Sequence, residues 1–157
     1  MPSIEDFQRV AIEEAKLALA KGNMPIGCVI VCDGEIVGRA HNTVDSDRSD
    51  LGHAEMNALR KVEHLLFGEL KGRCEIYCTL EPCLMCYGAL ANYRIKRLVY
   101  SVSDLHAGYS RAAQLPAYYA ARKFEVVTGV LKEEVLGLLK SYVAKTGHRA
   151  HLLASLI

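Results

Sequence analysis

The amino-acid sequence predicts a layered α/β domain built around a central sheet. Short runs of β-branched and aromatic residues indicate strands, and longer segments between them carry apolar residues at helical spacing. The two kinds of segment alternate along the chain. With 157 residues, of which 51% are hydrophobic and 24% charged, the chain is long enough to bury one sizeable core. We therefore expect a single domain over residues 1–157.

The local signals for each element are capping residues, turn residues and periodicity. Ser3 followed by Asp6 forms a capping-box pattern that begins a first helix, and Gly22 ends it. The dipeptide Asp33-Gly34 is typical of a tight hairpin turn between two strands. The elements expected after the first helix are, in chain order, strands at 26–32 and 35–42, a helix from about residue 53, a strand at 74–79, a helix at 83–92, strands at 97–102 and 124–127, and a helix at 131–143.

Two short motifs together predict an open zinc site. One is His53-Ala54-Glu55, and the other is Pro82-Cys83-Leu84-Met85-Cys86. Zinc is bound tetrahedrally by nitrogen and sulfur ligands, so the imidazole of His53 and the thiolates of Cys83 and Cys86 supply three of four positions. The fourth position stays open for water or substrate, which is typical of a catalytic zinc. Both motifs begin predicted helices, whose N-termini stabilise thiolates.

Hydrolysis at an open zinc site needs a nucleophile at neutral pH and a group that carries protons. Zinc lowers the pKa of a bound water from 15.7 to about 7, which supplies hydroxide. Glu55 lies two residues from His53, so its carboxylate is expected beside the metal without being a ligand. A thioredoxin-like redox pair at Cys83 and Cys86 would leave His53 and Glu55 unexplained.

The two motifs, in this order and with a proline before the first cysteine, resemble the zinc-dependent cytidine/deoxycytidylate deaminase superfamily. Within it the chain is similar to bacterial tRNA adenosine deaminases and to free-base (guanine/cytosine) deaminases, from Met24 to about Ser101. The resemblance implies a three-layer α/β/α domain with a central mixed five-stranded sheet. It also implies one Zn²⁺ per chain and a homodimer.

The resemblance implies roles for four residues around the metal. Glu55 would take a proton from water, protonate a ring nitrogen and later protonate the departing amino group. Asn42 would lie in the base pocket, where the backbone N–H of Ala54 and the carbonyl of Glu81 would hold the polar edge of the substrate. Asn42 has an alternative role, because its side chain can cap a loop.

The segments that set substrate identity in the family differ here, at 49–53, 104–111 and the apolar C-terminal segment 150–157. The net charge is only +1, and the basic stretches 94–97 and 140–149 are thin, which disfavours tight RNA binding. We therefore expect a zinc-dependent hydrolase that deaminates a free nucleobase or nucleoside. The alternatives are a tRNA adenosine-to-inosine deaminase and a non-catalytic zinc domain that binds nucleic acid or a protein.

The remaining expectations concern compartment and side chains outside the motifs. No apolar run approaches the ~20 residues of a membrane helix, and the N-terminus lacks a signal-peptide pattern, so we expect a cytoplasmic protein with no membrane partner. Its cysteines should then be reduced. Two sets of side chains could approach the pocket, and for both an ordinary structural role is an open alternative: His41 with His106, and Tyr109, Tyr118 and Tyr119. Core packing is expected for Cys28, Cys32, Cys74 and Cys78.

Overall fold

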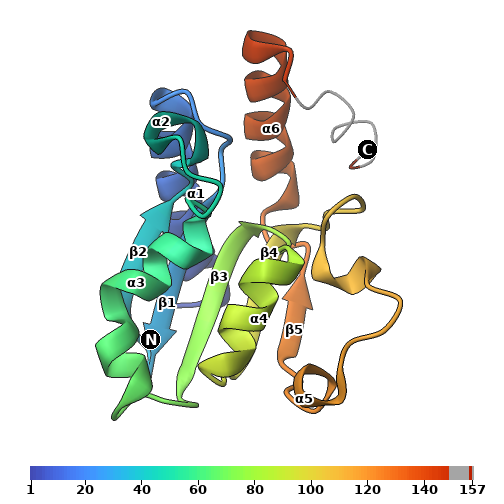
Figure 1. Ribbon diagram of the computed structural model, residues 1–157. Coiled ribbons are helices and arrows are strands. Elements are labelled where there is room, and N and C mark those ends of the chain that lie inside the picture. Colours follow the sequence, from blue (N-terminus) through green and yellow to red (C-terminus); the bar gives the residue numbers. More distant parts are fainter. Residues whose placement is uncertain (149–155, 157) are drawn as a thin grey trace.

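The computed structural model describes residues 1–148 and Leu156. A five-stranded sheet with strand order β2-β1-β3-β4-β5 forms its centre (Figure 1). The strands are β1 (Gly27–Cys32), β2 (Glu35–His41), β3 (Cys74–Leu80), β4 (Arg97–Val102) and β5 (Glu125–Thr128). The helices are α1 (Ile4–Ala20), α2 (Val44–Asp47), α3 (Ala54–Phe67), α4 (Leu84–Asn92), α5 (Ala117–Ala120) and α6 (Lys132–Thr146), with a 3₁₀ turn, η1 (Tyr109–Arg111).

Helices cover both faces of the sheet, so the domain has three layers. Successive residues of β1 point to opposite faces: Cys28 and Ile30 pack in the core under α3 and α4, whereas Val29 and Val31 pack against α1. Helix α6 closes the second face beside α1, and Figure 1 shows α3 and α4 on the other side. Both faces of β1 are therefore buried, which explains its nearly continuous apolar sequence. The predicted three-layer α/β/α architecture is confirmed.

The capping box of the first helix and the hairpin between the first two strands form as predicted. Ser3 Oγ accepts the backbone N–H of Asp6, and a carboxylate oxygen of Asp6 accepts the N–H of Ser3 at 2.7 Å, which completes the capping box. In the hairpin between β1 and β2, Asp33 and Gly34 have φ values of 53° and 86°. Two successive positive φ values are those of the turn that suits the twist of an antiparallel pair.

The strand directions bring both metal motifs to one edge of the sheet. Strand β1 runs antiparallel to β2 and β3, and β3, β4 and β5 are parallel, so the sheet is mixed. Strands β2 and β3 therefore run in the same direction and end at the same edge. Helix α3 follows β2 through α2, and α4 follows β3 directly, so the N-termini of α3 and α4 meet there. Ligands of open α/β sheets bind at this edge.

The cysteines of β1 and β3 show that the prediction of fully reduced cysteines is wrong in part. Cys28, Cys32, Cys74 and Cys78 are all buried in the core, as predicted. Cys32 and Cys74, however, form a disulfide, so the prediction that all six cysteines are reduced is wrong for this pair. The two residues are direct cross-strand partners with Cα atoms 4.2 Å apart, which places their sulfurs within bonding reach. Cys28 and Cys78 are paired across the same strands and are free thiols.

The remaining sequence predictions concern the C-terminal segment, membrane-spanning helices and short elements. The prediction for the apolar segment 150–157 lies outside the described residues, except at Leu156, which packs at the margin of the core that holds α6. In the described part of the chain, no helix has the length and apolar character needed to cross a membrane. The short elements α2, η1 and α5 were not predicted.

Candidate zinc centre and substrate pocket

His53, Cys83 and Cys86 meet at the edge where α3 and α4 begin. Nδ1 of His53 lies 3.5 Å from Sγ of Cys83 and 3.5 Å from Sγ of Cys86. All three ligand atoms lie within 4.8 Å of one another. Zinc–sulfur and zinc–nitrogen bond lengths at a tetrahedral angle require an N···S separation of about 3.6 Å. The three side chains therefore already hold the spacing that one zinc ion needs.

The two helix N-termini favour negative charge at this point. His53 is the N-cap of α3 and Cys83 is the N-cap of α4, and neither side chain caps its own helix through a hydrogen bond. The hydrogen bond from the Cys86 thiol, together with the nearby His53 ring, lowers the pKa of Cys83 to about 4. A thiolate is thus favoured at Cys83, as metal ligation requires.

Glu55 lies in the first turn of α3, beside the three ligands. Its side chain is 4% exposed and lines the same cavity as His53 and Cys83. Burial raises the pKa of the Glu55 carboxyl to about 6. A buried carboxyl group next to a metal centre, in a cavity that a substrate can enter, is suited to proton transfer. A structural zinc site has no need of such a group.

The cavity at the zinc centre has a volume of about 230 Å³. Its wall combines apolar side chains with a few polar groups, as ligand sites commonly do. Three of the predicted site residues besides the metal ligands line it, namely Asn42, Glu55 and Glu81. Ala54 does not line it, and substrate contact through its backbone N–H stays a prediction. The described residues that line the cavity are Met24, Ile26, Asn42, His53, Glu55, Leu80, Glu81, Cys83, Asp104, His106 and Ala107.

Asn42 caps a loop and also lines the cavity, and its role in binding a base stays a prediction. Its backbone N–H donates to the carbonyl of Ile26 at 2.9 Å, which fixes the end of β2 against the start of β1. Its Oδ1 accepts the N–H of Val44 at 3.2 Å, so the side chain does cap the loop into α2. The side chain is buried, at 3% exposure, and faces the cavity. Its amide Nδ2 makes no hydrogen bond to any residue that the structure describes, which leaves that donor for a ligand.

The side chain of Glu81 has a structural role that the sequence reasoning missed. One carboxylate oxygen accepts the N–H of Asp104 at 3.0 Å, and the other accepts the N–H of Ser110 at 3.0 Å. The carboxylate therefore holds both ends of the loop 104–110, which forms part of the cavity wall. Gly108 permits this close approach, because an added Cβ would lie 2.5 Å from Cδ of Glu81 and 2.4 Å from the carbonyl oxygen of Asp104.

The other candidate side chains separate into those that reach the cavity and those that do not. His106 lines it, in the loop held by Glu81. His41 points elsewhere: its Nδ1 lies 2.8 Å from a carboxylate oxygen of Glu14, and its Nε2 lies 3.2 Å from Nζ of Lys21. Tyr109, Tyr118 and Tyr119 do not line the cavity, which favours the structural alternative for them over a pocket lid. Tyr109 stacks on Tyr87 instead.

Comparison with known proteins shows the class to which this fold and site belong. Residues 1–102 match the family described as cytidine and deoxycytidylate deaminase, zinc-binding region. The match covers more than half of the chain and includes all three residues of the metal cluster. The chain therefore belongs to the cytidine and deoxycytidylate deaminase family, and its cofactor is zinc.

Two relatives show which members of the family the chain is similar to. The chain is 42% identical to the tRNA-specific adenosine deaminase of Aquifex aeolicus over 104 residues, which cover 66% of this chain and 69% of the relative. It is 38% identical to the tRNA-specific adenosine deaminase of Bacillus subtilis over 145 residues, which cover 90% and 89%.

Two solved structures represent the neighbours of this fold. A structure from a study of tRNA:A34 deaminases that edit the wobble position has a TM-score of 0.74 at 29% identity, covering 85% of this chain and 98% of that one. The guanine deaminase of Bacillus subtilis has a TM-score of 0.62 at 30% identity, covering 74% and 80%. The same fold thus serves an enzyme that edits RNA and an enzyme named for a free base.

Proposed function

We propose that this protein is a zinc-dependent hydrolase that converts adenosine to inosine in a tRNA. The observation that carries the proposal is the 38% identity to a tRNA-specific adenosine deaminase over nine-tenths of both chains. Charge and loop sequence favour a free nucleobase or nucleoside, and the likeness to tRNA deaminases outweighs that argument because it extends beyond the metal motifs.

The proposed chemistry divides between the metal, held by three side chains, and the carboxyl group of Glu55. His53, Cys83 and Cys86 would hold a zinc ion, which when bound activates water at neutral pH. Glu55, buried in the same cavity, would accept a proton from the attacking water and deliver protons to the ring nitrogen and the leaving amino group. Water addition at the amino-bearing carbon, followed by loss of ammonia, gives the deaminated base.

The cavity supports recognition of a base rather than of a whole nucleotide. Its volume of about 230 Å³ is below the ~300–1,000 Å³ of typical small-molecule sites, so a single heterocycle fits with little room beside it. Apolar contacts from Met24, Ile26 and Leu80 would cover the faces of the ring, and Nδ2 of Asn42 would donate to an acceptor at its edge. A base extruded from a loop can enter such a cavity while its sugar and phosphates stay outside.

Hydrolysis of a free base such as guanine is the second candidate. Two observations favour it: the likeness to the Bacillus subtilis guanine deaminase, and the absence of Lys and Arg among the described residues that line the cavity. The zinc-loaded protein should be incubated with a tRNA transcript, with free bases and with nucleosides, and both inosine and ammonia should be measured. We expect inosine in the tRNA at a rate above any ammonia release from a free base. Ammonia release from a free base or nucleoside without inosine formation would reverse the choice.

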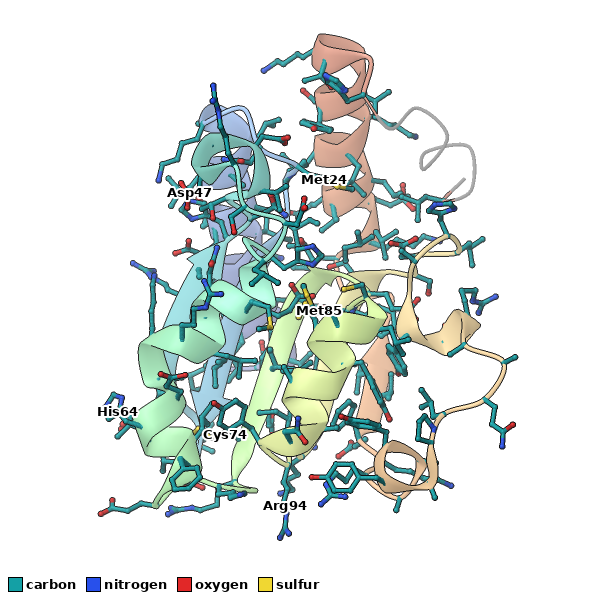
Figure 2. The ribbon with its side chains drawn as sticks, in the orientation of Figure 1. Met24, Asp47, His64, Cys74, Met85 and Arg94 are labelled. Carbon is teal, nitrogen blue, oxygen red and sulfur yellow. A yellow bond between two sulfur atoms is a disulfide. The ribbon has the colours of Figure 1, made fainter. Side chains whose placement is uncertain are left out.

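We also infer that the protein assembles as a homodimer through the exposed face of α4. Leu84 and Met85 are 53% and 37% exposed, and with Gly88 and Ala89 they border a cavity of about 460 Å³ that reaches Pro116. Figure 2 shows Met85 at the end of α4 nearest the zinc edge. Apolar surface of this kind marks protein interfaces.

The oligomeric state tests this inference. Leu84→Lys/Met85→Lys should lower the mass measured by light scattering from that of a dimer to that of one chain. The matched control Phe67→Lys alters another exposed apolar side chain, at 77% exposure on α3, and should stay dimeric. A wild-type protein with the mass of one chain would contradict the dimer.

A further inference from the structure

A second cavity, at the end of the sheet opposite the zinc centre, is lined by four basic side chains. It has a volume of about 420 Å³, and its cations come from two segments, Arg94 and Lys96 before β4 and Arg122 and Lys123 before β5. We call it the basic cavity. No acidic side chain is among the described residues that line it. Since the whole chain has a net charge of only +1, this concentration does not follow from a basic composition.

The cations that line the basic cavity differ from nearby cations, which form ion pairs with carboxylates. Arg97 forms ion pairs with Glu75 and Glu125, and Arg73 forms one with Asp33, so these two neighbours are already neutralised. Within the described part of the chain, none of the four cations of the basic cavity lies within ion-pair distance of a carboxylate. Unpaired cations that converge on one hollow repel one another, and a bound anion relieves that repulsion.

Tyr118 holds the guanidinium of Arg122 in place. Its guanidinium carbon lies 3.5 Å from the centroid of the Tyr118 ring, and its Nη1 donates to the carbonyl of Tyr118 at 3.0 Å. Its Nε is buried and has no hydrogen-bond acceptor among the described residues. A guanidinium whose position is fixed by stacking is suited to bind an oxygen ligand such as phosphate through its other N–H groups.

The position of the basic cavity limits what the ligand can be. It lies at the amino ends of β4 and β5, whereas the zinc centre lies at the edge where β2 and β3 end. Figure 2 shows Arg94 at the opposite end of the molecule from Met24, which lines the zinc cavity. Strand β4 has six residues and a length of about 20 Å, so the two sites lie about that far apart. At about 3.4 Å per stacked nucleotide, that distance corresponds to about six nucleotides.

We propose that the basic cavity binds backbone phosphates of the RNA substrate, several nucleotides away from the base that enters the zinc cavity. This inference rests on the proposed function, because it takes the ligand to be the same tRNA. It also resolves a conflict: the chain matches tRNA deaminases, whereas the described residues that line the zinc cavity include no Lys or Arg. The phosphate contacts lie at the other end of the sheet and would position the RNA without reading its sequence.

The test compares two RNAs and two double variants. Binding of a full-length tRNA transcript and of its isolated anticodon stem-loop is measured over a range of salt concentrations for zinc-loaded wild type and for Arg94→Ala/Lys123→Ala. Both side chains are exposed, so the fold should be retained, which a thermal melt verifies. The matched control, Arg9→Ala/Arg73→Ala, also removes two cations, but these are ion-paired and lie outside the basic cavity.

We expect Arg94→Ala/Lys123→Ala to bind full-length tRNA about tenfold more weakly, with a salt slope reduced by about two. The stem-loop, which extends about six nucleotides from the reacting base, should lose affinity as well, and the control should behave as wild type with both RNAs. Equal affinity and slope in the variant and the control would overturn the inference. If wild type binds tRNA through the basic cavity but forms no inosine, the proposed function fails while the phosphate site stands.

Discussion

Nδ1 of His53 and Sγ of Cys83 lie 3.5 Å apart, although thirty residues separate them in the chain. Each is the N-cap of a helix, and the two helices start at the same edge because β2 and β3 run in the same direction. The sheet topology therefore brings one imidazole and two thiolates to zinc-binding distance before any metal arrives. An arrangement of this kind reduces the ordering that metal binding would otherwise require.

The metal centre gives the first prediction. His53→Ala and Cys83→Ala should each lose most of the single zinc ion, because two remaining ligands leave half of the tetrahedral shell to water. Elemental analysis of the purified variants measures this loss. His64→Ala is the matched control, since His64 is an exposed histidine further along α3, as Figure 2 shows. Full zinc content in both ligand variants would refute the assignment.

Asn42 allows its two roles to be separated by paired substitutions. Asn42→Asp keeps an oxygen that can accept the N–H of Val44 and removes the amide donor that faces the cavity. We expect the transition state to lose about 1–3 kcal/mol of stabilisation, the usual effect of an unpaired polar group, so that turnover falls. Asn42→Ala should reduce both turnover and stability. Normal turnover by Asn42→Asp would show that Asn42 is only a loop cap.

Glu81 should control the shape of the pocket through the loop 104–110. Glu81→Gln replaces one accepting oxygen with an NH₂ group, which cannot accept an N–H from Asp104 or Ser110. We expect KM to rise, with zinc content unchanged, because the wall that carries His106 is no longer fixed. Gly108→Ala should have the same effect through the clash of its Cβ with Glu81. Wild-type KM in both variants would exclude this role.

The disulfide gives a prediction about stability. Cys32 and Cys74 are 42 residues apart, and closing a loop of that length stabilises the folded state by about 4 kcal/mol through restriction of the unfolded chain. Cys32→Ala/Cys74→Ala should therefore unfold at a clearly lower denaturant concentration. Thiol titration of the denatured, unreduced wild type should find the four free cysteines per chain. Six reactive thiols would contradict the disulfide.

The sequence predicted the elements whose signals are local. The Ser3 capping box, the Asp33-Gly34 hairpin and the helical starts at both metal motifs depend on neighbouring residues and were confirmed. The four-residue helices α2 and α5 are too short to show a period of 3.6 residues, so periodicity could not reveal them.

The pairing of residues on neighbouring strands could not be predicted from the sequence. The disulfide depends on the register that places Cys32 opposite Cys74, and a shift of one residue would have turned either side chain to the other face. The role of the Glu81 carboxylate likewise depends on a loop more than twenty residues away. Residue spacing also gave no means of deciding that His106 reaches the cavity while His41 turns toward Glu14.

The central claim is that Glu55 acts in catalysis beside a zinc ion that it does not bind. The direct test measures zinc content and inosine formation in a tRNA transcript for Glu55→Gln, a substitution that preserves shape and removes the proton carrier. We predict one zinc per chain and a rate lowered by at least about 10²–10⁴-fold, the usual contribution of general acid–base catalysis. Near-normal inosine formation by Glu55→Gln would contradict the account, and so would loss of the zinc.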